Sequence, residues 1–407
     1  MAQKDAASNS ATDERCGPLT DVRVIELGQL IAGPFCGQLL ADFGADVIKV
    51  EPPGKGDPMR EWGRGEYPLW WTICARNKRC VTADLRAPEG QDIVRRLIRE
   101  ADILIENFRP GTMEKWGLGY EALKAINPRI IMVRVSGYGQ TGPYSPRAGY
   151  ASVGEAMGGM RYLSGYPDRP SSRTGLSIGD SLAATFACVG ALAALHERDR
   201  TGEGQVVDSA IYEAVLNIME ATIPEYAVSN YIRTRSGSKL PNVAPSNVYE
   251  CKDGEYLIAA NQDTVFRRLC EAIDMPELAE DERFATHTAR GVNQDLLDSI
   301  IGEWASRRTM DEIEALMVKA AVPAGKIYRA PEMLADPHFA AREAIIDVEH
   351  PKWKSLKMQN VFPKLSRTPG KVRWAGPEYG AHTEEVYRDA LGMSDEEIAD
   401  LKARGII

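Results

Sequence analysis

The sequence has few histidines and lacks the spacings that are typical of a metal site. Its five histidines form no HExxH pattern, and its seven cysteines include no CxxC pair. These absences argue against a two-histidine helix site, a cysteine-based zinc site and a disulfide framework. An odd number of cysteines is typical of the reducing cytoplasm. We therefore predict a cytoplasmic protein with no metal site.

Positive charge and long apolar runs are also scarce. The chain has 49 Lys and Arg against 58 Asp and Glu, a net charge of −9. This argues against nucleic-acid binding, because phosphates require a dense basic surface. No run of about 18 apolar residues is present, so we expect no transmembrane helix and no membrane partner. Residues 1–17 have no apolar segment, which predicts a disordered tail rather than a secretion signal or a transit peptide.

Two motifs of nucleotide and acyl chemistry are missing, and a third is incomplete. There is no Walker A sequence and no GxSxG elbow. The run GYGQTG at 137–142 matches GxGxxG after an expected strand, but Pro143 and Pro146 follow it. A dinucleotide site needs a helix to begin at that point, and these prolines oppose one. The run is therefore weak evidence for nicotinamide binding.

The first half of the chain alternates short Val/Ile-rich runs with helical runs. Strands are expected at 21–27, 46–51, 80–85, 102–107 and 129–136, and helices at 34–45, 88–101 and 120–127. This alternation predicts an α/β fold with a parallel sheet between layers of helices. The segment 181–198 is apolar on nearly every face, which predicts a buried helix, and 206–220 continues with a strand and a helix.

The second half changes character at a polar linker at about 225–245. A hairpin at 248–260 and three amphipathic helices follow, the helices at 263–273, about 291–306 and 309–321. After 326 the chain is rich in proline and is expected to be irregular, until Ser394 and Glu397 form a capping box. The 407 residues exceed one ordinary domain. We predict a large domain from 18–225 and 326–407, and a small α+β domain at 226–325.

Two segments carry candidate binding or catalytic residues. Residues 105–120 leave the end of a strand with Arg109 and Lys115, which suit a phosphate group but also suit an ordinary solvated loop. The run 77–79 and Arg86 place further positive charge near another strand end, as ordinary surfaces also do. Asp180 precedes the long apolar helix. Its carboxylate can cap the helix, or act as a covalent nucleophile toward an acyl group, and the two interpretations are compatible.

Five segments, in this order, resemble the class III CoA-transferases, a family that includes formyl-CoA:oxalate, carnitine and bacterial dicarboxylate enzymes. They are LGQLIAGPFCGQLLADFGADVIKVEPPGKGDPMREWG (27–63), NKR (77–79), ADILIENFRPGTMEKWGLGYE (101–121), SGYGQTGPYSPRAGY (136–150) and GLSIGDSLAATFACVGALAALHERDRTGEGQVVD (175–208). The resemblance extends from about residue 18 to about 392. It implies a Rossmann-like large domain with a smaller inserted domain, and two ring-shaped chains that interlock as a homodimer.

The resemblance also implies an activity. CoA would pass from an acyl-CoA donor, expected to be succinyl-CoA, to a small dicarboxylate or hydroxydicarboxylate such as malate, citramalate, itaconate or glutarate. Coenzyme A and acyl-CoA would then be substrates and not resident cofactors. Asp180 would carry the anhydride and thioester intermediates. Four arginines near Asp180 could hold a distal carboxylate, although each is equally well an ordinary surface residue: Arg147, Arg161, Arg169 and Arg173.

The remaining site residues follow from the same resemblance. Expected CoA contacts are Leu30, Ile31, Ala32, Ala83, Arg86, Asn107, Phe108, Arg109 and Lys115, and expected substrate contacts are Tyr138, Gln140 and Asn261. The chain departs from the family at two places. Pro52 stands where some members have arginine, and the loop at 259–263 reads AANQD where the oxalate enzymes have a glycine-rich loop.

Two alternatives stay open within the family. The 2-methylacyl-CoA racemases pair the aspartate with a histidine in a Gly-His-Asp run, but residues 149–151 here read Gly-Tyr-Ala. Racemisation uses two bases on opposite faces of a carbon, so this reading is the minor one. Other members act as a heteromer of homologous subunits, one of which lacks the aspartate. Asp180 argues that this chain is the active type.

Overall fold

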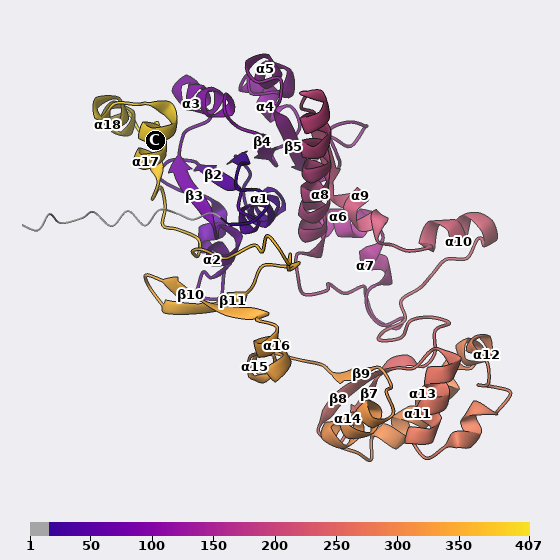
Figure 1. Ribbon diagram of the computed structural model, residues 1–407. Coiled ribbons are helices and arrows are strands. Elements are labelled where there is room, and N and C mark those ends of the chain that lie inside the picture. The colour runs from indigo at the N-terminus through magenta and orange to yellow at the C-terminus, as the bar shows by residue number, and fades with distance from the viewer. Residues whose placement is uncertain (1–15) are drawn as a thin grey trace, which may run out of the picture. The chain divides into compact units, whose positions relative to one another are not determined.

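A computed structural model describes residues 16–407, so most of the predicted tail at 1–17 lies outside the described residues. The described chain forms two compact units (Figure 1). Unit 1 comprises residues up to 159, 176–220 and 341–407, and unit 2 comprises 160–175 and 221–340. This division differs from the predicted domains at 160–175, at 221–225 and at 326–340.

Unit 1 contains a six-stranded parallel sheet, which confirms the predicted α/β class. Its strands are β1 (Arg23–Glu26), β2 (Asp46–Glu51), β3 (Lys78–Thr82), β4 (Ile103–Glu106), β5 (Ile131–Ser136) and β6 (Val206–Ala210). The strand order is β3-β2-β1-β4-β5-β6, and every neighbouring pair is parallel. This is the order of the Rossmann fold. The Val/Ile-rich runs form strands because both faces of the sheet are covered by helices.

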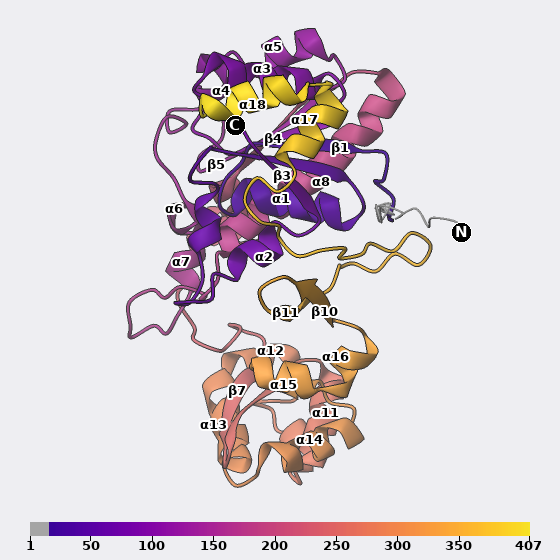
Figure 2. The ribbon, with the colours of Figure 1, turned by 90° about the vertical axis from the view of Figure 1, so that its left-hand side faces the viewer.

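Two layers of helices bury the two faces of the sheet (Figures 1 and 2). One face packs against α1 (Ala32–Asp42) and α8 (Ile178–Thr201). The other face packs against α3 (Pro88–Ile98), α5 (Tyr120–Ile126), α17 (Thr383–Leu391) and α18 (Asp395–Ala403). Smaller elements lie between these: η1 (Pro58–Glu61), α2 (Trp70–Cys74), α4 (Thr112–Lys115), α6 (Ala151–Met157) and α9 (Ile211–Asn217).

The prediction of an irregular chain after 326 is wrong in part. Strands β10 (Ile345–His350) and β11 (Lys354–Gln359) form an antiparallel hairpin. Val348 and Met358 of the hairpin join a small buried cluster with Phe43. The prolines on which the prediction rested stand outside both strands, so they do not interrupt the ladder.

Helix α8 is less buried than its composition predicts. The alanines of one face, among them Ala183 and Ala187, are fully buried against the sheet. On the other side Phe186, Val189 and Leu192 are 37–58% exposed. By length and composition α8 could also cross a membrane, contrary to the expectation of no transmembrane helix. Its alanine face packs in the core of unit 1, as a core helix does.

Unit 2 is a small α+β unit. Strands β7 (Ser246–Cys251), β8 (Gly254–Ala259) and β9 (Ala324–Lys326) form an antiparallel sheet. The three predicted helices are present as α11 (Asp263–Ala272), α13 (Gln294–Ala305) and α14 (Met310–Lys319), and they share one core with the sheet. Short segments complete the unit: α7 (Met160–Leu163), α10 (Thr222–Ser229), η2 (Pro276–Ala279), α12 (His287–Val292), α15 (Ala330–Ala335) and α16 (Pro337–Ala341).

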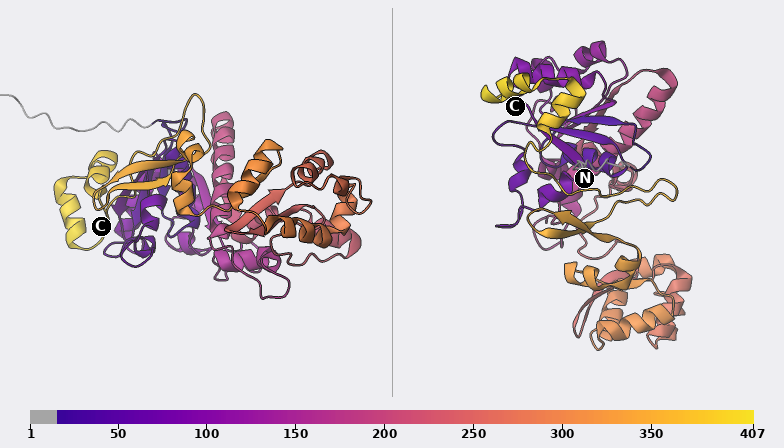
Figure 3. Two further views of the ribbon diagram at one scale, coloured as in Figure 1. Left: turned by 90° about the horizontal axis from the view of Figure 1, so that it is seen from below. Right: turned by 60° about the vertical axis from the view of Figure 1, so that its left-hand side comes forward.

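The C-terminal segment covers the free edge of β3. His382 donates its backbone N–H to the carbonyl of Cys80 (2.9 Å) and accepts the N–H of Cys80 on Nδ1 (3.1 Å). Tyr387 donates its hydroxyl to the carbonyl of Thr82 (2.7 Å). An edge strand exposes unpaired backbone groups, and these bonds satisfy them. The predicted capping box of Ser394 and Glu397 is present at α18, and Figure 3 shows the C-terminal helices beside the sheet.

The His382 contact predicts a pH effect on stability. Burial lowers the pKa of His382 below its ordinary value, although Glu385 opposes this. The folded protein therefore keeps the ring neutral while the unfolded chain takes up a proton, and stability falls as pH decreases below about 6.5. His382→Asn keeps an acceptor and removes the titration. We expect urea unfolding of the wild type to lose about 0.5 kcal/mol more than the variant between pH 7 and 5, a small value because the ring is half-buried. Parallel pH profiles of the two proteins would contradict the expectation.

Candidate active site

The strand order places a topological switch point between β1 and β4. β2 and β3 lie on one side of β1, whereas β4, β5 and β6 lie on the other. In open parallel sheets ligands bind at the carboxyl ends of the strands at such a point. Two segments leave the sheet there: the turn Gln29–Ala32 after β1, and residues 107–115 after β4. Most of the predicted CoA contacts lie in these two segments.

Asn107 joins the two segments. Its Oδ1 accepts the N–H of Gln29 and its Nδ2 donates to the carbonyl of Gln29, both at 2.8 Å. The next residue, Phe108, packs edge-to-face on Trp116 with ring centroids 5.1 Å apart. Close approach of the loops also requires Gly28, where a Cβ would lie 3.1 Å from the Asn107 amide oxygen. The side chain of Asn107 therefore binds the neighbouring turn in this structure.

The remaining predicted CoA contacts divide into buried and exposed residues. Ile31, Ala32 and Ala83 are at most 6% exposed, so mainly their backbone could face a ligand. Arg86, Arg109 and Lys115 are exposed, as a phosphate contact requires. Arg109 and Lys115 border α4, whose preceding Gly111 has a left-handed φ of 85°.

A buried network of charges lies beneath the Gln29–Ala32 turn. Lys49 Nζ is 3.1 Å from Glu26 and 2.8 Å from Asp57, and it also donates to the carbonyl of Gly28 (2.6 Å). Lys78 Nζ donates to both oxygens of the Glu26 carboxylate at 3.0 and 2.8 Å. These four charged side chains are at most 1% exposed. The prediction of surface charge at residues 77–79 is therefore wrong for Lys78.

A second pair completes the network and balances its charge. Arg60 forms two hydrogen bonds of 2.7 Å with the carboxylate of Glu51, which also accepts the N–H of Asp57 (2.8 Å). Three cations thus face three carboxylates, as buried charges require. Burial alone would lower the pKa of Lys49, but Asp57 and Glu26 outweigh it and raise that pKa.

One glycine makes room for the network. Gly37 lies on α1, and a Cβ at that position would stand 1.8 Å from Glu26 Oε2. No side chain fits there without displacing the buried carboxylate. The buried carboxylate of Glu26 on β1 therefore requires glycine at position 37, the second glycine of the AGPFCG run. This contact couples α1 to β1.

Ion pairs and a backbone hydrogen bond also hold the loop after β4. Glu106, the last residue of β4, bonds Arg134 (2.7 Å) and accepts the N–H of Phe108 (2.7 Å). Arg134 also pairs with Glu114 of α4 (2.7 Å). Burial raises the pKa of Glu106, against the opposing effect of Arg134. The guanidinium thus links the strand to the helix that carries Lys115.

Asp180 is the third residue of α8, and Ser177 is the N-cap. The interpretation of Asp180 as the N-cap is therefore wrong, although its carboxylate belongs to the first turn. Gly179 allows this turn to pack closely, since a Cβ would lie 3.2 Å from Ala151 O, the Glu155 side chain and Ile211. The Gly179 N–H also approaches Glu155 Oε1 at 3.3 Å. The position of Asp180 is thus set by α6 and α9, which surround its turn.

Tyr138 and Gln140 follow β5 at the same carboxyl edge of the sheet. The N–H of Gln140 binds Asp208 Oδ2 (2.9 Å), and Tyr138 stacks near Tyr144 and Tyr212. Within residues 16–407, the buried Nε2 of Gln140 has no hydrogen-bond partner. As predicted, no helix opens after 137–142; the next helix begins at Ala151.

Asn261 belongs to unit 2, between β8 and α11. Its carbonyl accepts a hydrogen bond from Arg290 (2.7 Å) and lies 3.2 Å from His287 Nδ1. Arg290 is fully buried and also bonds the carbonyls of Ala244 and Phe284. The loop that replaces the glycine-rich segment is therefore anchored at Asn261 by a buried guanidinium.

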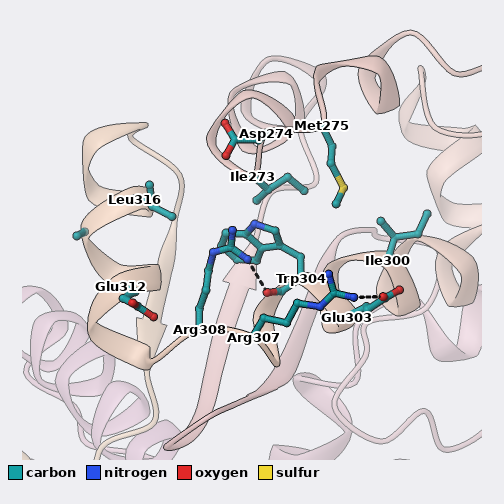
Figure 4. A pocket seen from close by; sticks show the side chains of 11 residues that line it. Ile273, Asp274, Met275, Ile300, Glu303, Trp304, Arg307, Arg308, Glu312 and Leu316 are labelled. Carbon is teal, nitrogen blue, oxygen red and sulfur yellow. Dashed lines mark hydrogen bonds and ion pairs between the residues drawn. The ribbon is translucent and has the colours of Figure 1, made fainter.

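Unit 2 also contains a cavity of about 830 Å³ that includes none of the predicted site residues (Figure 4). The guanidinium of Arg308 stacks on the Trp304 ring, 4.3 Å from its centroid, and donates to the Trp304 carbonyl. Arg307 pairs with Glu303 beside it. These contacts occupy both guanidinium groups within the unit.

The burial of the charges at Glu26, Lys49 and Asp57 was not predicted from the sequence. A signal was available for two of them, because Glu26 and Lys49 each stand between two apolar residues in Val/Ile-rich strands. A charge inside a buried strand must be paired. Asp57 precedes Pro58, which is typical of a helix start, and it caps η1. Sequence alone could not show that its carboxylate also reaches Leu30.

The chain matches known proteins over nearly its full length. Residues 19–383 match the model of CoA-transferase family III. The chain is 59% identical over 394 residues to succinyl-CoA–D-citramalate CoA-transferase of Chloroflexus aurantiacus, covering 96% of this chain and 98% of that protein. It is 41% identical to the alpha subunit of succinyl-CoA–L-malate CoA-transferase of the same organism, covering 99% and 96%. A crystal structure of a CaiB/BaiF family protein from Brucella suis has a TM-score of 0.81 at 36% identity, covering 92% and 100%.

The network beneath the turn predicts a large stability effect. Glu26→Gln removes the one carboxylate that Lys49 and Lys78 share and leaves uncompensated buried charge. We expect the free energy of unfolding in urea to fall by about 3–5 kcal/mol. The control is Glu100→Gln, which removes an exposed partner of Arg23 and should cost less than about 1 kcal/mol. Equal losses in the two variants would show that the network carries no special share of the stability.

Proposed function

The chain belongs to CoA-transferase family III, and from this membership we propose that it moves CoA from succinyl-CoA to a small dicarboxylic or hydroxydicarboxylic acid. The observation that carries the proposal is the 59% identity, over nearly the whole chain, to an enzyme named for succinyl-CoA and D-citramalate. Citramalate is therefore the first acceptor to test, and malate follows from the second relative. Itaconate and glutarate are further acids of the same class.

The proposed nucleophile is the carboxylate of Asp180. Asp180 lies in the first turn of the 24-residue α8, where the helix N-terminus stabilises negative charge. The close packing of Gly179 limits movement of that turn. Asp180 itself is half-buried, which leaves it accessible to a substrate. A carboxylate in a defined position suits covalent catalysis.

The transfer would proceed through four exchanges at Asp180. The carboxylate attacks the thioester carbon of succinyl-CoA, the C–S bond breaks, and an anhydride and CoA thiolate form. The thiolate attacks the aspartyl carbonyl, which releases succinate and leaves an aspartyl-CoA thioester. The acceptor carboxylate then displaces the thiolate to give a second anhydride. Attack of the thiolate on the acceptor carbonyl regenerates Asp180 and gives the new acyl-CoA. No oxidant or reductant is needed.

The negative oxygens that form in these steps need hydrogen-bond donors. We assign this role to backbone N–H groups of the turn around Ala32 and Gly33. The amide of Gln140 is a further donor, since its buried Nε2 has no partner within residues 16–407. The exposed cations Arg86, Arg109 and Lys115 would bind the phosphates of CoA.

The proposed assembly is an interlocked homodimer in the cytoplasm. The outward face of α8 supports a partner, because Phe186, Val189 and Leu192 remain exposed there, and exposed apolar patches mark interaction surfaces. The alternative is a heteromer with a homologous subunit, as the alpha-subunit name of one relative implies for that protein. All seven cysteines are free thiols in the described chain, which is typical of a reducing compartment.

A panel of acids tests the reaction. The purified chain is incubated with succinyl-CoA and, separately, citramalate, malate, itaconate, glutarate or acetate, and the acyl-CoA products are read by mass spectrometry. We expect a new dicarboxyl-CoA with at least one of the first four acids and none with acetate. Turnover by this chain alone would also contradict the need for a second subunit. If no acid accepts CoA from any donor, the proposed function is wrong. Loss of an α-deuterium from a branched acyl-CoA would instead favour the racemase.

Asp180→Ala tests the nucleophile. The substitution removes the acyl acceptor, so we expect transfer to fall by at least about 10³-fold, while calorimetry shows unchanged CoA binding. Asp199→Ala, at the other end of α8, is the matched control and should retain activity. Hydroxylamine added in mid-reaction should convert Asp180 of the wild type into a hydroxamate, visible by peptide mass spectrometry. Normal turnover by the alanine variant would refute the assignment.

A further inference from the structure

We propose that Asp57 is a positioning residue that holds the Gln29–Ala32 turn in the conformation that receives the acyl-CoA thioester. The inference rests on the proposed function, because that function makes the turn a CoA contact. Asp57 is not one of the residues that were expected to touch CoA. It contacts the turn from the buried side, through the N–H of Leu30. Its carboxylate is a hydrogen-bond acceptor for the turn and a partner of the buried charges.

The turn has a backbone conformation that needs support. Leu30 has a φ of 63°, in the left-handed region that residues other than glycine rarely adopt. Such a conformation persists only where surrounding contacts enforce it. The Leu30 N–H donates to Asp57 Oδ1 at 3.1 Å. On one side the backbone of Gln29 is bonded by Asn107, and on the other α1 begins at Ala32.

Asp57 is itself fixed on all sides. The same Oδ1 accepts the N–H of Met59 at 2.9 Å, and the backbone N–H of Asp57 donates to Glu51 Oε2 at 2.8 Å. Its Oδ2 lies 2.8 Å from Lys49 Nζ. Asp57 is 1% exposed, so the carboxylate has no alternative partner in solvent. If the carboxylate turned away from Leu30 it would also leave Lys49, which would then pair with Glu26 alone.

Lys49 extends the support to the start of the turn. Its ammonium donates to the carbonyl of Gly28 (2.6 Å) while it pairs with Asp57. The network therefore holds Gly28 and Leu30, the two neighbours of Gln29, through one ion pair. A carboxylate that only capped η1 would need no contact with either residue. The two contacts, of Asp57 with Leu30 and of Lys49 with Gly28, favour a positioning role over simple capping.

The chain offers a matched carboxylate without such contacts. Asp42, near the end of α1, is 3% exposed and pairs with Arg76 at 2.6 Å and with Asn77 at 3.0 Å. None of the hydrogen bonds of its carboxylate goes to the Gln29–Ala32 turn. Removing Asp42 leaves the buried Arg76 without its carboxylate, and removing Asp57 leaves Lys49 with Glu26 alone, so both should lower stability. Only the loss of Asp57 should change the turn.

Kinetics of Asp57→Ala, Asp57→Asn and Asp42→Ala provide the test. All three are expected to unfold at lower urea concentration than the wild type. For Asp57→Ala we expect KM for succinyl-CoA to rise by about 10-fold or more, with KM for the acceptor acid within two-fold. Asp57→Asn retains one acceptor oxygen and should recover part of that loss. Asp42→Ala should keep both KM values. Equal kinetic losses in Asp57→Ala and Asp42→Ala would overturn the proposal.

Hydrogen exchange gives a readout that does not depend on activity. In the wild type without ligand, the Leu30 amide should exchange slowly, and in Asp57→Ala at least about 10-fold faster, while amides of α3 remain unchanged. Rapid exchange at Leu30 in the wild type would overturn the proposal even if no Asp57 variant folds. If the wild type binds no CoA and transfers none, the proposed function fails, and the exchange result still decides whether Asp57 orders the turn. Normal CoA affinity in Asp57→Ala with a mobile turn would refute the positioning role alone.

Discussion

The structure depends on the pairing of charges that are buried beneath the first βα turn. Glu26 ends β1 next to Ile25, and Lys49 lies within β2 between Ile48 and Val50; the next strand, β3, places Lys78 against Glu26. Ions without water are tolerated only when they pair and their remaining hydrogen bonds are made. This requirement fixes the positions of β1, β2 and β3 relative to one another. It also restricts position 37 of α1 to glycine, because a Cβ there would collide with the carboxylate of Glu26.

The same network orders the loops at the carboxyl edge of the sheet, where the proposed CoA contacts lie. The network reaches the backbone of the turn through Asp57 and Lys49, and Asn107 joins that turn to the loop after β4. Glu106 repeats the arrangement on the neighbouring strand, where it holds the Phe108 N–H. The loops at the switch point are thus ordered before a ligand arrives, which reduces the entropy lost on binding. The exposed cations Arg109 and Lys115 lie beyond them, and these are the cations proposed to bind the phosphates of CoA.

Much of the fold could be predicted from local patterns, and the failures have physical causes. The strands and helices of unit 1 follow Val/Ile runs and amphipathic periods, so the order of these elements along the chain was predicted correctly. The hairpin of β10 and β11 was missed because the prolines around it suggested an irregular chain. Asp180 was taken as an N-cap, but Ser177 caps α8, since a helix start can shift by one turn without changing its apolar face. Lys78 was taken as a surface charge because its partner, Glu26, is 52 residues away.

The sequence by itself determined the α/β class, the two-part organisation of the chain and, through a set of ordered motifs, the family; the same motifs pointed to Asp180 as the proposed nucleophile. These depend on local propensity and on residues that stand together in the chain. Only the tertiary structure decided which charged residues are buried, that Leu30 is left-handed, and that Asp57 supports it. The reason is that a hydrogen bond across 27 residues depends on how two strands and a turn meet in space. No local pattern contains that information.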